Sequence, residues 1–394
     1  MNKMRSGSFT LQSLWKKTKA TRRLFSAESD LYLSAKVDVI AHRGASGYMP
    51  DHTLPTYKSA FESGSDWIEL DAHCTKDGVL VVNHDIELHE TTDVADWEWA
   101  APLRTRTKAP AMDGELSTMI GWMISDFSLE QIKRLRVKMR DDSRDRDHDL
   151  LFEIPTVEET ANFVQSLVDN VHVNSHNDEY TREEWLEARN QFTLKHGFAR
   201  ANTNVGLYIE TKRASYYRNL GLPLEENLVD VLENSTFKGP IIIQSFELDS
   251  LKLIRHLKPE WKTVKLLTRP ELDHHTNNGT LSPFMESLSQ HCDGIGPNKL
   301  SIIPNPKEPP KKSDAIDAAH AHDMFVHPYT FRSDVRHLHR VYGGNATQEF
   351  AEFFNLGVDG VFCDFPDHGV YARESCNLLR SQGVEYSSFY RVTE

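Results

Sequence analysis

The sequence has few cysteines and no long apolar run. Its 394 residues include four cysteines (Cys74, Cys292, Cys363 and Cys376), which show neither a CxxC pair nor the spacing of a zinc site. A disulfide framework is therefore not expected, and these cysteines suit a reducing compartment. No run approaches the ~18 apolar residues that a membrane-spanning helix needs, so we expect no stable membrane insertion.

Positive charge is also in short supply. The chain has 45 Lys and Arg residues against 58 Asp and Glu residues, and its net charge of −13 argues against a nucleic acid or an anionic membrane as partner. A hydrophobic content of 39% and a charged content of 26% exclude disordered and collagen-like classes. The length suggests two to three domains, although α/β barrels of this size fold as one domain.

Acidic residues are absent from positions 1–27. This composition is typical of an organellar transit peptide, and a disordered basic tail is equally consistent with it. No apolar segment of ~7–15 residues follows the charges, so a secretory signal is not expected. We expect a basic extension over residues 1–35, a short tail over 381–394, and a cytoplasmic or mitochondrial protein. The basic residues are Lys3, Arg5, Lys16, Lys17, Lys19, Arg22 and Arg23.

Short apolar runs recur from residue 37 onward, with helical stretches between most of them. This alternation indicates a parallel sheet covered on both faces, and eight such units close into a barrel whose active site lies at the carboxyl ends of the strands. Nine runs are present. The link Thr75–Gly78 is too short for a helix, so a tight turn is predicted between the second and third runs. The runs are Val37–Ala41, Trp67–Leu70, Val79–Val82, Gly206–Ile209, Pro240–Ile243, Val264–Leu267, Gly294–Gly296, Phe325–Val326 and Val358–Phe362.

The pattern changes between about residues 86 and 153. Three tryptophans, two prolines and a charged run from Lys133 to Asp149 occupy a stretch without a clear period. A segment of this length predicts an insertion over the strand ends that would serve as a lid. The charged run itself is expected to be a solvated surface.

Charged and titratable residues follow the apolar runs. His42 and Arg43 end the first run, and Glu69 and Asp71 flank Leu70 at the end of the second. Residues two apart in a strand point to the same face. Two carboxylates on one face of a dry sheet would repel each other unless a cation holds them.

Two further strand ends carry the same kinds of residues. His84 ends the third run, and Glu210 and Lys212 are again two apart after the fourth. Carboxylate ligands favour Ca²⁺ or Mg²⁺ over zinc, and Lys and Arg beside a metal suit a phosphate. Two imidazoles suit proton removal from a nucleophile and proton donation to a leaving oxygen. The set predicts metal-assisted cleavage of a phosphodiester.

Motifs in the same order along the chain now support a family resemblance. They are His42–Pro50 followed by Thr53–Pro55, Ile68–Asp71, Thr75–Gly78, His84–Asp85, Thr91–Asp96, Glu210–Lys212, Asp293–Pro297, His327–Thr330 and Asp364–Asp367. Together they span roughly residues 37–372 and resemble the glycerophosphodiester phosphodiesterase family, most closely its bacterial periplasmic branch.

The resemblance implies a distorted TIM (β/α)₈ barrel over residues 36–380, with an insertion after the third strand. It also implies metal-dependent hydrolysis of small-molecule glycerophosphodiesters, such as glycerophosphocholine and glycerophosphoethanolamine, to sn-glycerol 3-phosphate and an alcohol. The glycerol 2-hydroxyl would be the internal nucleophile and give a cyclic phosphate that water opens, because an attached hydroxyl has a high effective concentration.

The motif positions imply a role for each matching residue. Glu69, Asp71 and Glu210 would hold Ca²⁺ or Mg²⁺. His42 and His84 would be the acid–base pair, and the sequence leaves open which one is the base in the first step. Arg43 and Lys212 would bind the phosphate. One departure stands out, because the family commonly has Pro-Glu-Asn-Thr where this chain has Pro50-Asp51-His52-Thr53. If Asp51 supports Arg43, its shorter side chain predicts a looser support.

Other residues have two interpretations. His327 and Tyr329 would line the headgroup side of the pocket, although a buried structural histidine is equally consistent. Phe246 would face the substrate or fill the top of the barrel, and Asp364 would support the site from the last strand end. The remaining histidines singled out are expected at the surface, namely His73, His274, His275, His337 and His339.

Two other functions are considered. A lysophospholipase D-like or sphingomyelinase D-like enzyme would act on lipid from the same barrel, and should bring an apolar rim or an anchor that the sequence does not clearly show. A binding protein that has lost catalysis is the second alternative, and the intact histidine pair and carboxylate triad argue against it.

Overall fold

The computed structural model describes residues 37–110, 116–174, 202–303, 313–338 and 340–381. The predicted extension over residues 1–35 lies outside the described residues, as does nearly all of the predicted tail over 381–394. Among the described helices, none combines the length and the apolar composition that crossing a bilayer requires.

Eight parallel strands form the barrel, in the order β10-β9-β8-β7-β6-β2-β1-β11. The two end strands meet through backbone hydrogen bonds from Asp359 N to Val326 O (3.0 Å) and from Phe331 N to Phe362 O (2.8 Å). The predicted distorted TIM barrel is therefore confirmed. The strands are β1 (Asp38–Ala41), β2 (Trp67–Cys74), β6 (Gly206–Thr211), β7 (Ile241–Ser245), β8 (Lys262–Leu267), β9 (Gly294–Pro297), β10 (Phe325–Val326) and β11 (Gly360–Cys363).

The third of the nine apolar runs, Val79–Val82, is not a barrel strand. It forms β3 (Leu80–Val82), which pairs antiparallel with the end of β2. The turn between them is closed by hydrogen bonds from Gly78 N to Thr75 O (3.0 Å) and from Thr75 N to Val79 O (2.9 Å). The predicted tight turn is thus present. It lengthens β2 beyond the barrel and carries the chain away from the barrel at this point.

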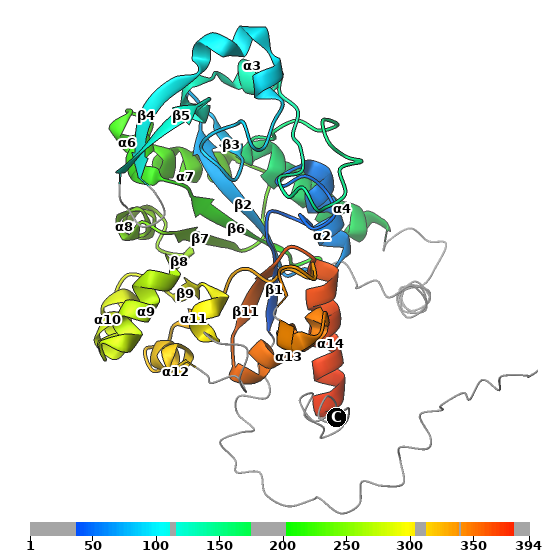
Figure 1. The fold of residues 1–394 in the computed structure, drawn as a ribbon, viewed down its shortest axis with the longest axis vertical. Helices are drawn as coiled ribbons and strands as arrows, with labels where there is room; N and C mark the ends of the chain where they lie inside the picture. Colours follow the sequence, from blue (N-terminus) through cyan, green and yellow to red (C-terminus); the bar gives the residue numbers. More distant parts are fainter. Residues whose placement is uncertain (1–36, 111–115, 175–201, 304–312, 339, 382–394) are drawn as a thin grey trace, which may run out of the picture. The chain divides into compact units, whose positions relative to one another are not determined.

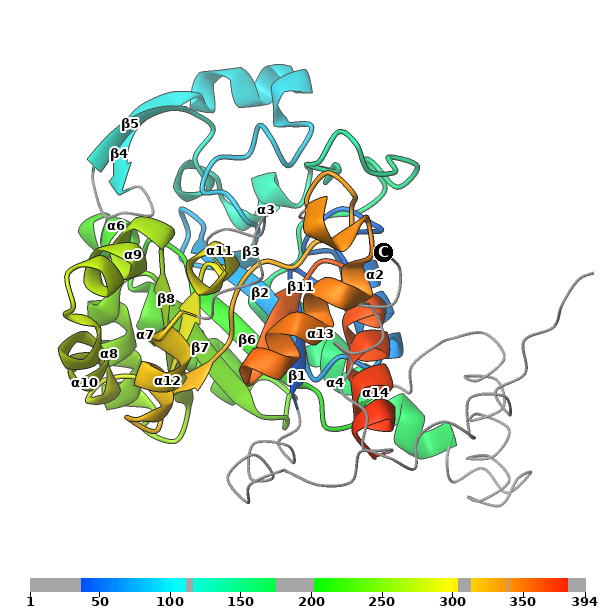
Figure 2. The ribbon, with the colours of Figure 1, turned by 60° about the horizontal axis from the view of Figure 1, so that its bottom comes forward.

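Helices pack around the outside of the barrel, as Figures 1 and 2 show. Two of them begin with the signals that the sequence carries. Thr53 caps α2 by accepting from Thr56 N, and Thr268 and Glu271 form a reciprocal capping box at the start of α9. The helices are α2 (Leu54–Glu62), α4 (Val157–Asn174), α6 (Ala214–Asn219), α7 (Leu224–Asn234), α8 (Leu248–Leu257), α9 (Arg269–Asn277), α10 (Leu281–Ser289), α11 (Lys299–Ile302), α12 (Ala315–His320), α13 (Ala346–Leu356) and α14 (Pro366–Ser381), with one 3₁₀ turn, η5 (Arg340–Tyr342).

The alternation of side chains along β2 decides which residues face the barrel interior. Ile68 and Leu70 pack in a hydrophobic cluster with residues of the surrounding helices, whereas Trp67 packs with the interior side chains of neighbouring strands. Glu69 and Asp71 share the parity of Trp67 and therefore point inward. The same strand thus supplies both the apolar outer contact and the charged inner face.

The predicted insertion after the third strand is confirmed and has a core of its own. It packs buried side chains such as Leu88, Ile124, Phe127 and Leu135 against Val81 of β3. Figure 1 shows it in cyan, with the two-stranded sheet β4–β5. Its elements are η2 (Val94–Asp96), η3 (Glu98–Leu103), β4 (Thr105–Pro110), β5 (Leu116–Gly121), η4 (Ile124–Asp126) and α3 (Leu129–Ile132).

The expectation that the run Lys133–Asp149 is a solvated surface is wrong in part. The Arg146 side chain is 45% exposed, but the Arg144 side chain is only 6% exposed and contacts residues of the barrel. The cause is tertiary, because the loop folds back over the strand ends and meets acidic residues there.

Candidate active site

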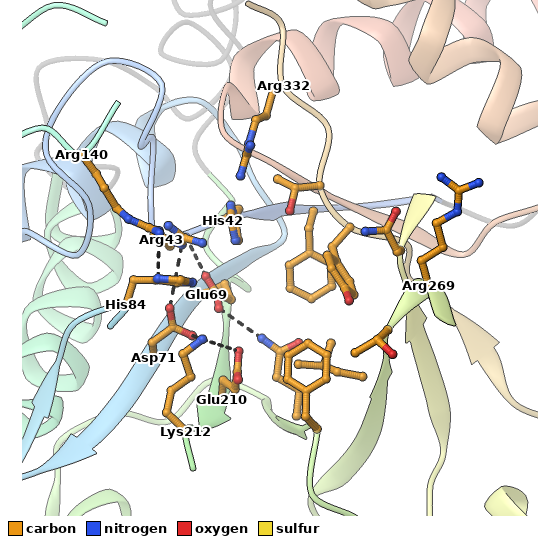
Figure 3. Close-up of a pocket in the computed structure, with 18 of the residues that line it drawn as sticks. His42, Arg43, Glu69, Asp71, His84, Arg140, Glu210, Lys212, Arg269 and Arg332 are labelled. Carbon is orange, nitrogen blue, oxygen red and sulfur yellow. Dashed lines mark hydrogen bonds and ion pairs between the residues drawn. The ribbon is translucent and has the colours of Figure 1, made fainter. Parts of the chain in front are cut away.

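One pocket lies at the carboxyl ends of the barrel strands and encloses about 440 Å³ (Figure 3). Side chains from the ends of β1, β2 and β6 converge on it because the carboxyl ends of parallel strands share one edge of the barrel. His84 reaches the same edge by another route, because the antiparallel β3 leads the chain back along β2, where Asn83 N donates to Asp71 O at 3.1 Å. The structure therefore brings together the seven residues for which the motifs implied a role: His42, Arg43, Glu69, Asp71, His84, Glu210 and Lys212.

Three buried carboxylates form a compact group in this pocket. Each of Glu69, Asp71 and Glu210 offers an oxygen, and these oxygens lie within 4.8 Å of one another. The strand register explains the proximity, since Asp71 of β2 pairs with Glu210 of β6. Asp71 Oδ1 is buried and accepts no hydrogen bond from the described residues. Three clustered carboxylate oxygens, one of which accepts no hydrogen bond from the described residues, fit a divalent cation that prefers oxygen ligands.

The carboxyls do not share one electrostatic environment. Burial and the neighbouring Asp71 raise the pKa of Glu69 well above its ordinary value, and burial raises the pKa of Glu210 to about 8. Burial would also raise the pKa of Asp71, but Lys212 and His52 hold it well below its usual range. Without a cation the group therefore retains protons near neutral pH, and binding a cation would displace them.

Arg43 sits on a tight turn that follows β1. Its φ is 60°, and Gly44 follows with φ 81°, where an added Cβ would lie 2.5 Å from Thr56 Cγ2. This turn directs Arg43 N toward Glu69, which accepts at Oε2 (2.6 Å). Arg43 Nη1 donates to Asp51 Oδ2 at 2.8 Å, so the shorter side chain at this position still supports the arginine.

His52 contacts Asp71, one of the three clustered carboxylates. Its Nε2 lies 2.9 Å from Asp71 Oδ2, and its Nδ1 lies 2.9 Å from the hydroxyl of Tyr57. The side chain is only 2% exposed. His52 therefore fixes the orientation of Asp71, a contact that the sequence analysis did not predict.

The two pocket histidines have different partners. His42 Nδ1 lies 2.7 Å from Asp364 Oδ1, so the carboxylate accepts the Nδ1 proton and leaves the lone pair on Nε2. His84 Nδ1 lies 2.8 Å from both Asp85 Oδ1 and Arg140 Nη1. Burial lowers the pKa of His42 to about 4 and the pKa of His84 well below its ordinary value, and in both cases Arg43 adds to the effect. Both rings are therefore neutral near pH 7.

Several residues of the pocket were missed by sequence reasoning. Arg140 comes from the insertion, Arg332 from the segment after β10 and Arg269 from the start of α9 (Figure 3). Gln244 of β7 donates to Glu69 Oε1 at 3.1 Å. Gln244 lies near the carboxyl end of β7 and was detectable from that position, whereas Arg140 and Arg332 lie in loops without a periodic pattern and Arg269 begins the helix α9.

Of the four residues for which the sequence allowed two interpretations, two line the pocket and two do not. Phe246 and Tyr329 line the pocket, with ring centroids 6.2 Å apart. Asp364 lies behind His42, and His327 is not among the lining residues but packs against Tyr208 and Phe325.

The expectation of a surface position for His73 is wrong. It is fully buried, with Nδ1 2.8 Å from the Tyr217 hydroxyl. This partner lies 144 positions along the chain and gives no local signal in the sequence. His339 lies outside the described residues.

Comparison with known proteins places these observations in a family. The sequence model of the glycerophosphoryl diester phosphodiesterase family matches residues 42–368. Glycerophosphodiester phosphodiesterase GDPD6 of Arabidopsis thaliana is 29% identical over 347 residues, which cover 83% of each chain.

Two solved structures share the fold. One, from Silicibacter pomeroyi, has a TM-score of 0.60 at 17% identity and covers 87% of this chain and 95% of that one. The other, an Oleispira antarctica phosphodiesterase in complex with the product sn-glycerol-3-phosphate, has a TM-score of 0.54 at 19% identity and covers 86% and 97%. With a family match that spans most of its length, the chain belongs to the glycerophosphoryl diester phosphodiesterase family.

Proposed function

We propose that this protein hydrolyses glycerophosphodiesters to sn-glycerol 3-phosphate and an alcohol. One observation carries the proposal. A single pocket holds two neutral histidines, three clustered carboxylates, and the cations Arg43 and Lys212. These are the groups that proton transfer and phosphate binding require. Family membership and the named activity of the Arabidopsis relative add support.

Glu69, Asp71 and Glu210 would hold the metal ion, which we propose to be Ca²⁺ or Mg²⁺. Such a cation would neutralise phosphate charge and stabilise the negative charge that develops during phosphoryl transfer. Arg43 and Lys212 approach the carboxylates from the pocket side, with Lys212 Nζ 3.2 Å from Glu210 Oε2 and 3.5 Å from Asp71 Oδ1. Their remaining N–H groups are the donors that would bind the phosphate oxygens.

His42 is the better placed base for the first step. Asp364 accepts the Nδ1 proton, so Nε2 is free to take the proton of the glycerol 2-hydroxyl as that oxygen attacks phosphorus. His84 would supply a proton to the departing alcohol oxygen. His84 would act in its protonated form, which the anionic phosphate favours, because a nearby negative charge raises the pKa of an imidazole that burial and cationic neighbours lower. The pair exchanges roles when water opens the cyclic phosphate.

The proposal is tested by incubating the purified full-length protein with glycerophosphocholine and glycerophosphoethanolamine. Release of sn-glycerol 3-phosphate is measured, with and without EDTA. We expect product without chelator, loss of activity with EDTA, and recovery on adding back Ca²⁺ or Mg²⁺. Undiminished turnover in EDTA would contradict the metal assignment. A lysophospholipid in the same assay tests the lipid-acting alternative, which predicts faster release of the lipid product.

Three further predictions remain proposals. We propose that the catalytic barrel spans residues 36–380 and that the protein is cytoplasmic or mitochondrial. The composition of residues 1–27 supports either location, and sequencing the mature N-terminus decides between them: a start near residue 26–27 indicates a cleaved transit peptide, and an intact Met1 indicates a tail. We also propose that the chain belongs to the bacterial periplasmic branch, because the resemblance to that branch includes a histidine at the third place of the Pro50–Thr53 motif, although the plant relative does not favour this placement.

A further inference from the structure

Arg144 is a charged residue of the insertion whose side chain is only 6% exposed. Its Nη2 lies 2.6 Å from Asp364 Oδ2 and 2.8 Å from Asp334 Oδ2, and its Nε lies 3.3 Å from Asp334 Oδ1. Its Nη1 donates to the backbone oxygen of Ser46 at 3.1 Å. The guanidinium also lies over the ring of Phe365, 5.3 Å from its centroid. A side chain from the insertion is therefore tied to the segments that follow three barrel strands, β1, β10 and β11.

Asp364 connects this arginine to the pocket. One oxygen, Oδ2, faces Arg144, and the other, Oδ1, lies 2.7 Å from His42 Nδ1. The Asp364 side chain is 4% exposed. Burial alone would raise the pKa of this carboxyl, but His42, Arg144 and Arg332 hold it well below its usual range. A charged carboxylate in this buried position depends on its cationic partners.

We propose that Arg144 is a positioning residue for the reaction, because it fixes the Asp364 carboxylate that orients the His42 ring. The inference rests on the proposed function and extends it to the insertion. Arg144 has no contact with the carboxylate group Glu69, Asp71 and Glu210 among the described residues. It acts through Asp364, which lies 220 positions away in the sequence.

The surrounding charges explain why no neighbour replaces Arg144. Arg332 reaches Asp364 Oδ2 only through Nε at 3.2 Å, and its side chain is 36% exposed. Without Arg144, the carboxylates of Asp334 and Asp364 would share no cation and would repel each other. Asp364 would then turn toward Arg332, and His42 Nδ1 would lose its fixed acceptor. A small displacement of a catalytic group costs up to about 10²-fold in rate.

The experiment uses the full-length, metal-loaded protein and the variants Arg144→Ala and Arg144→Lys. Arg146→Ala is the matched control, because Arg146 lies in the same loop and, among the residues that the structure describes, its side-chain hydrogen bonds go to Met139, Asp142 and Asp149 of that loop. Three quantities are measured: kcat and KM on glycerophosphocholine, the metal Kd, and the ¹H NMR signal of the proton on His42 Nδ1, assigned by its loss in His42→Ala.

We expect Arg144→Ala to lower kcat about 10–100-fold while KM and the metal Kd change by less than about threefold. Lys should restore part of the loss, since it keeps the charge but not the planar fork. The Nδ1 proton signal should shift or broaden in Arg144→Ala and persist in Arg146→Ala. In an Asp364→Asn background, Arg144→Ala should add little, because both residues act on one ring.

An unchanged kcat in Arg144→Ala, or a full additional loss in the Asp364→Asn background, would overturn the proposal. An unchanged Nδ1 signal in Arg144→Ala and Arg144→Lys would overturn it as well, whatever the activity. A wild-type protein that releases no sn-glycerol 3-phosphate would instead reject the proposed function, and the NMR comparison would still decide whether Arg144 positions His42.

Discussion

Replacing His52 by Ala should weaken binding of the proposed metal ion about 10–100-fold, the usual effect of removing a side chain that orients a metal ligand. His52 Nε2 lies 2.9 Å from Asp71 Oδ2 and is the closest partner of that oxygen. Arg43 Nε is more distant from the same oxygen, at 3.8 Å, and Lys212 Nζ lies 3.5 Å from the other carboxylate oxygen, Oδ1. Without the imidazole, Asp71 gains rotational freedom that metal binding would have to remove.

The expected loss of affinity corresponds to about 1.4–2.7 kcal/mol. Isothermal titration calorimetry of the metal-free protein with Ca²⁺ and with Mg²⁺ measures it directly and does not depend on turnover. His52→Asn retains an amide donor and is the residue common in the family, so it should recover part of the affinity. His274→Ala is the matched control, because His274 lies on the outer helix α9 and, within the described part of the chain, its side chain hydrogen-bonds to Asn278 alone.

Truncating a buried side chain also lowers the free energy of unfolding, by about 0.5–3 kcal/mol for most single substitutions. Thermal unfolding of each metal-free variant therefore accompanies the titrations, so that binding is compared among folded proteins. A His52→Ala protein that is folded and binds both metals within about threefold of the wild-type Kd would refute the argument that His52 positions Asp71.

Three other predictions follow from single residues. His42→Ala and His84→Ala should each lower kcat about 10²–10⁴-fold. A p-nitrophenyl leaving group departs without a proton, so on such a substrate His84→Ala should lower kcat much less. Equal losses of kcat on both substrates would contradict the assignment of His84 as the acid. Burial lowers the pKa of His327 from 6.5 to about 4. The contribution of His327 to the free energy of unfolding should therefore be complete above pH 6.5. It should fall by about 3 kcal/mol as pH falls toward 4, because the unfolded chain binds the proton more tightly. Urea unfolding at several pH values should show a flatter profile for His327→Gln, and a profile parallel to wild type would contradict this. Gly44→Ala should lower both Tm and kcat, because Gly44 has φ 81° and no room for a Cβ beside Thr56; a wild-type Tm would refute the constraint.

Strand-end residues were predictable because strand geometry is regular and local. Once the apolar runs are recognised as parallel strands, the residues at their carboxyl ends must share one edge of the barrel. This reasoning alone predicted that His42 and Glu210 approach each other, and the period of two predicted that Glu69 and Asp71 point the same way. His84 was also predicted at this edge, but it arrives there through the antiparallel β3 and not at the end of a parallel strand. It also distinguished the hairpin of β3 from a barrel strand, since its link to β2 is too short for a crossover helix.

Loop residues were not predictable, because their positions depend on partners far away in the chain. Arg144 lies in a charged run that reads as solvated surface, and only the folding of the insertion over the strand ends brings it to Asp364. His73 is in strand β2 and not in a loop, but it too reads as a surface histidine until Tyr217 of α6 supplies its buried partner. The sequence by itself determined the barrel and the charged groups at its mouth, through repeating local geometry. The tertiary structure alone decided how those groups are held, because the supporting contacts are made by aperiodic loops across long sequence separations.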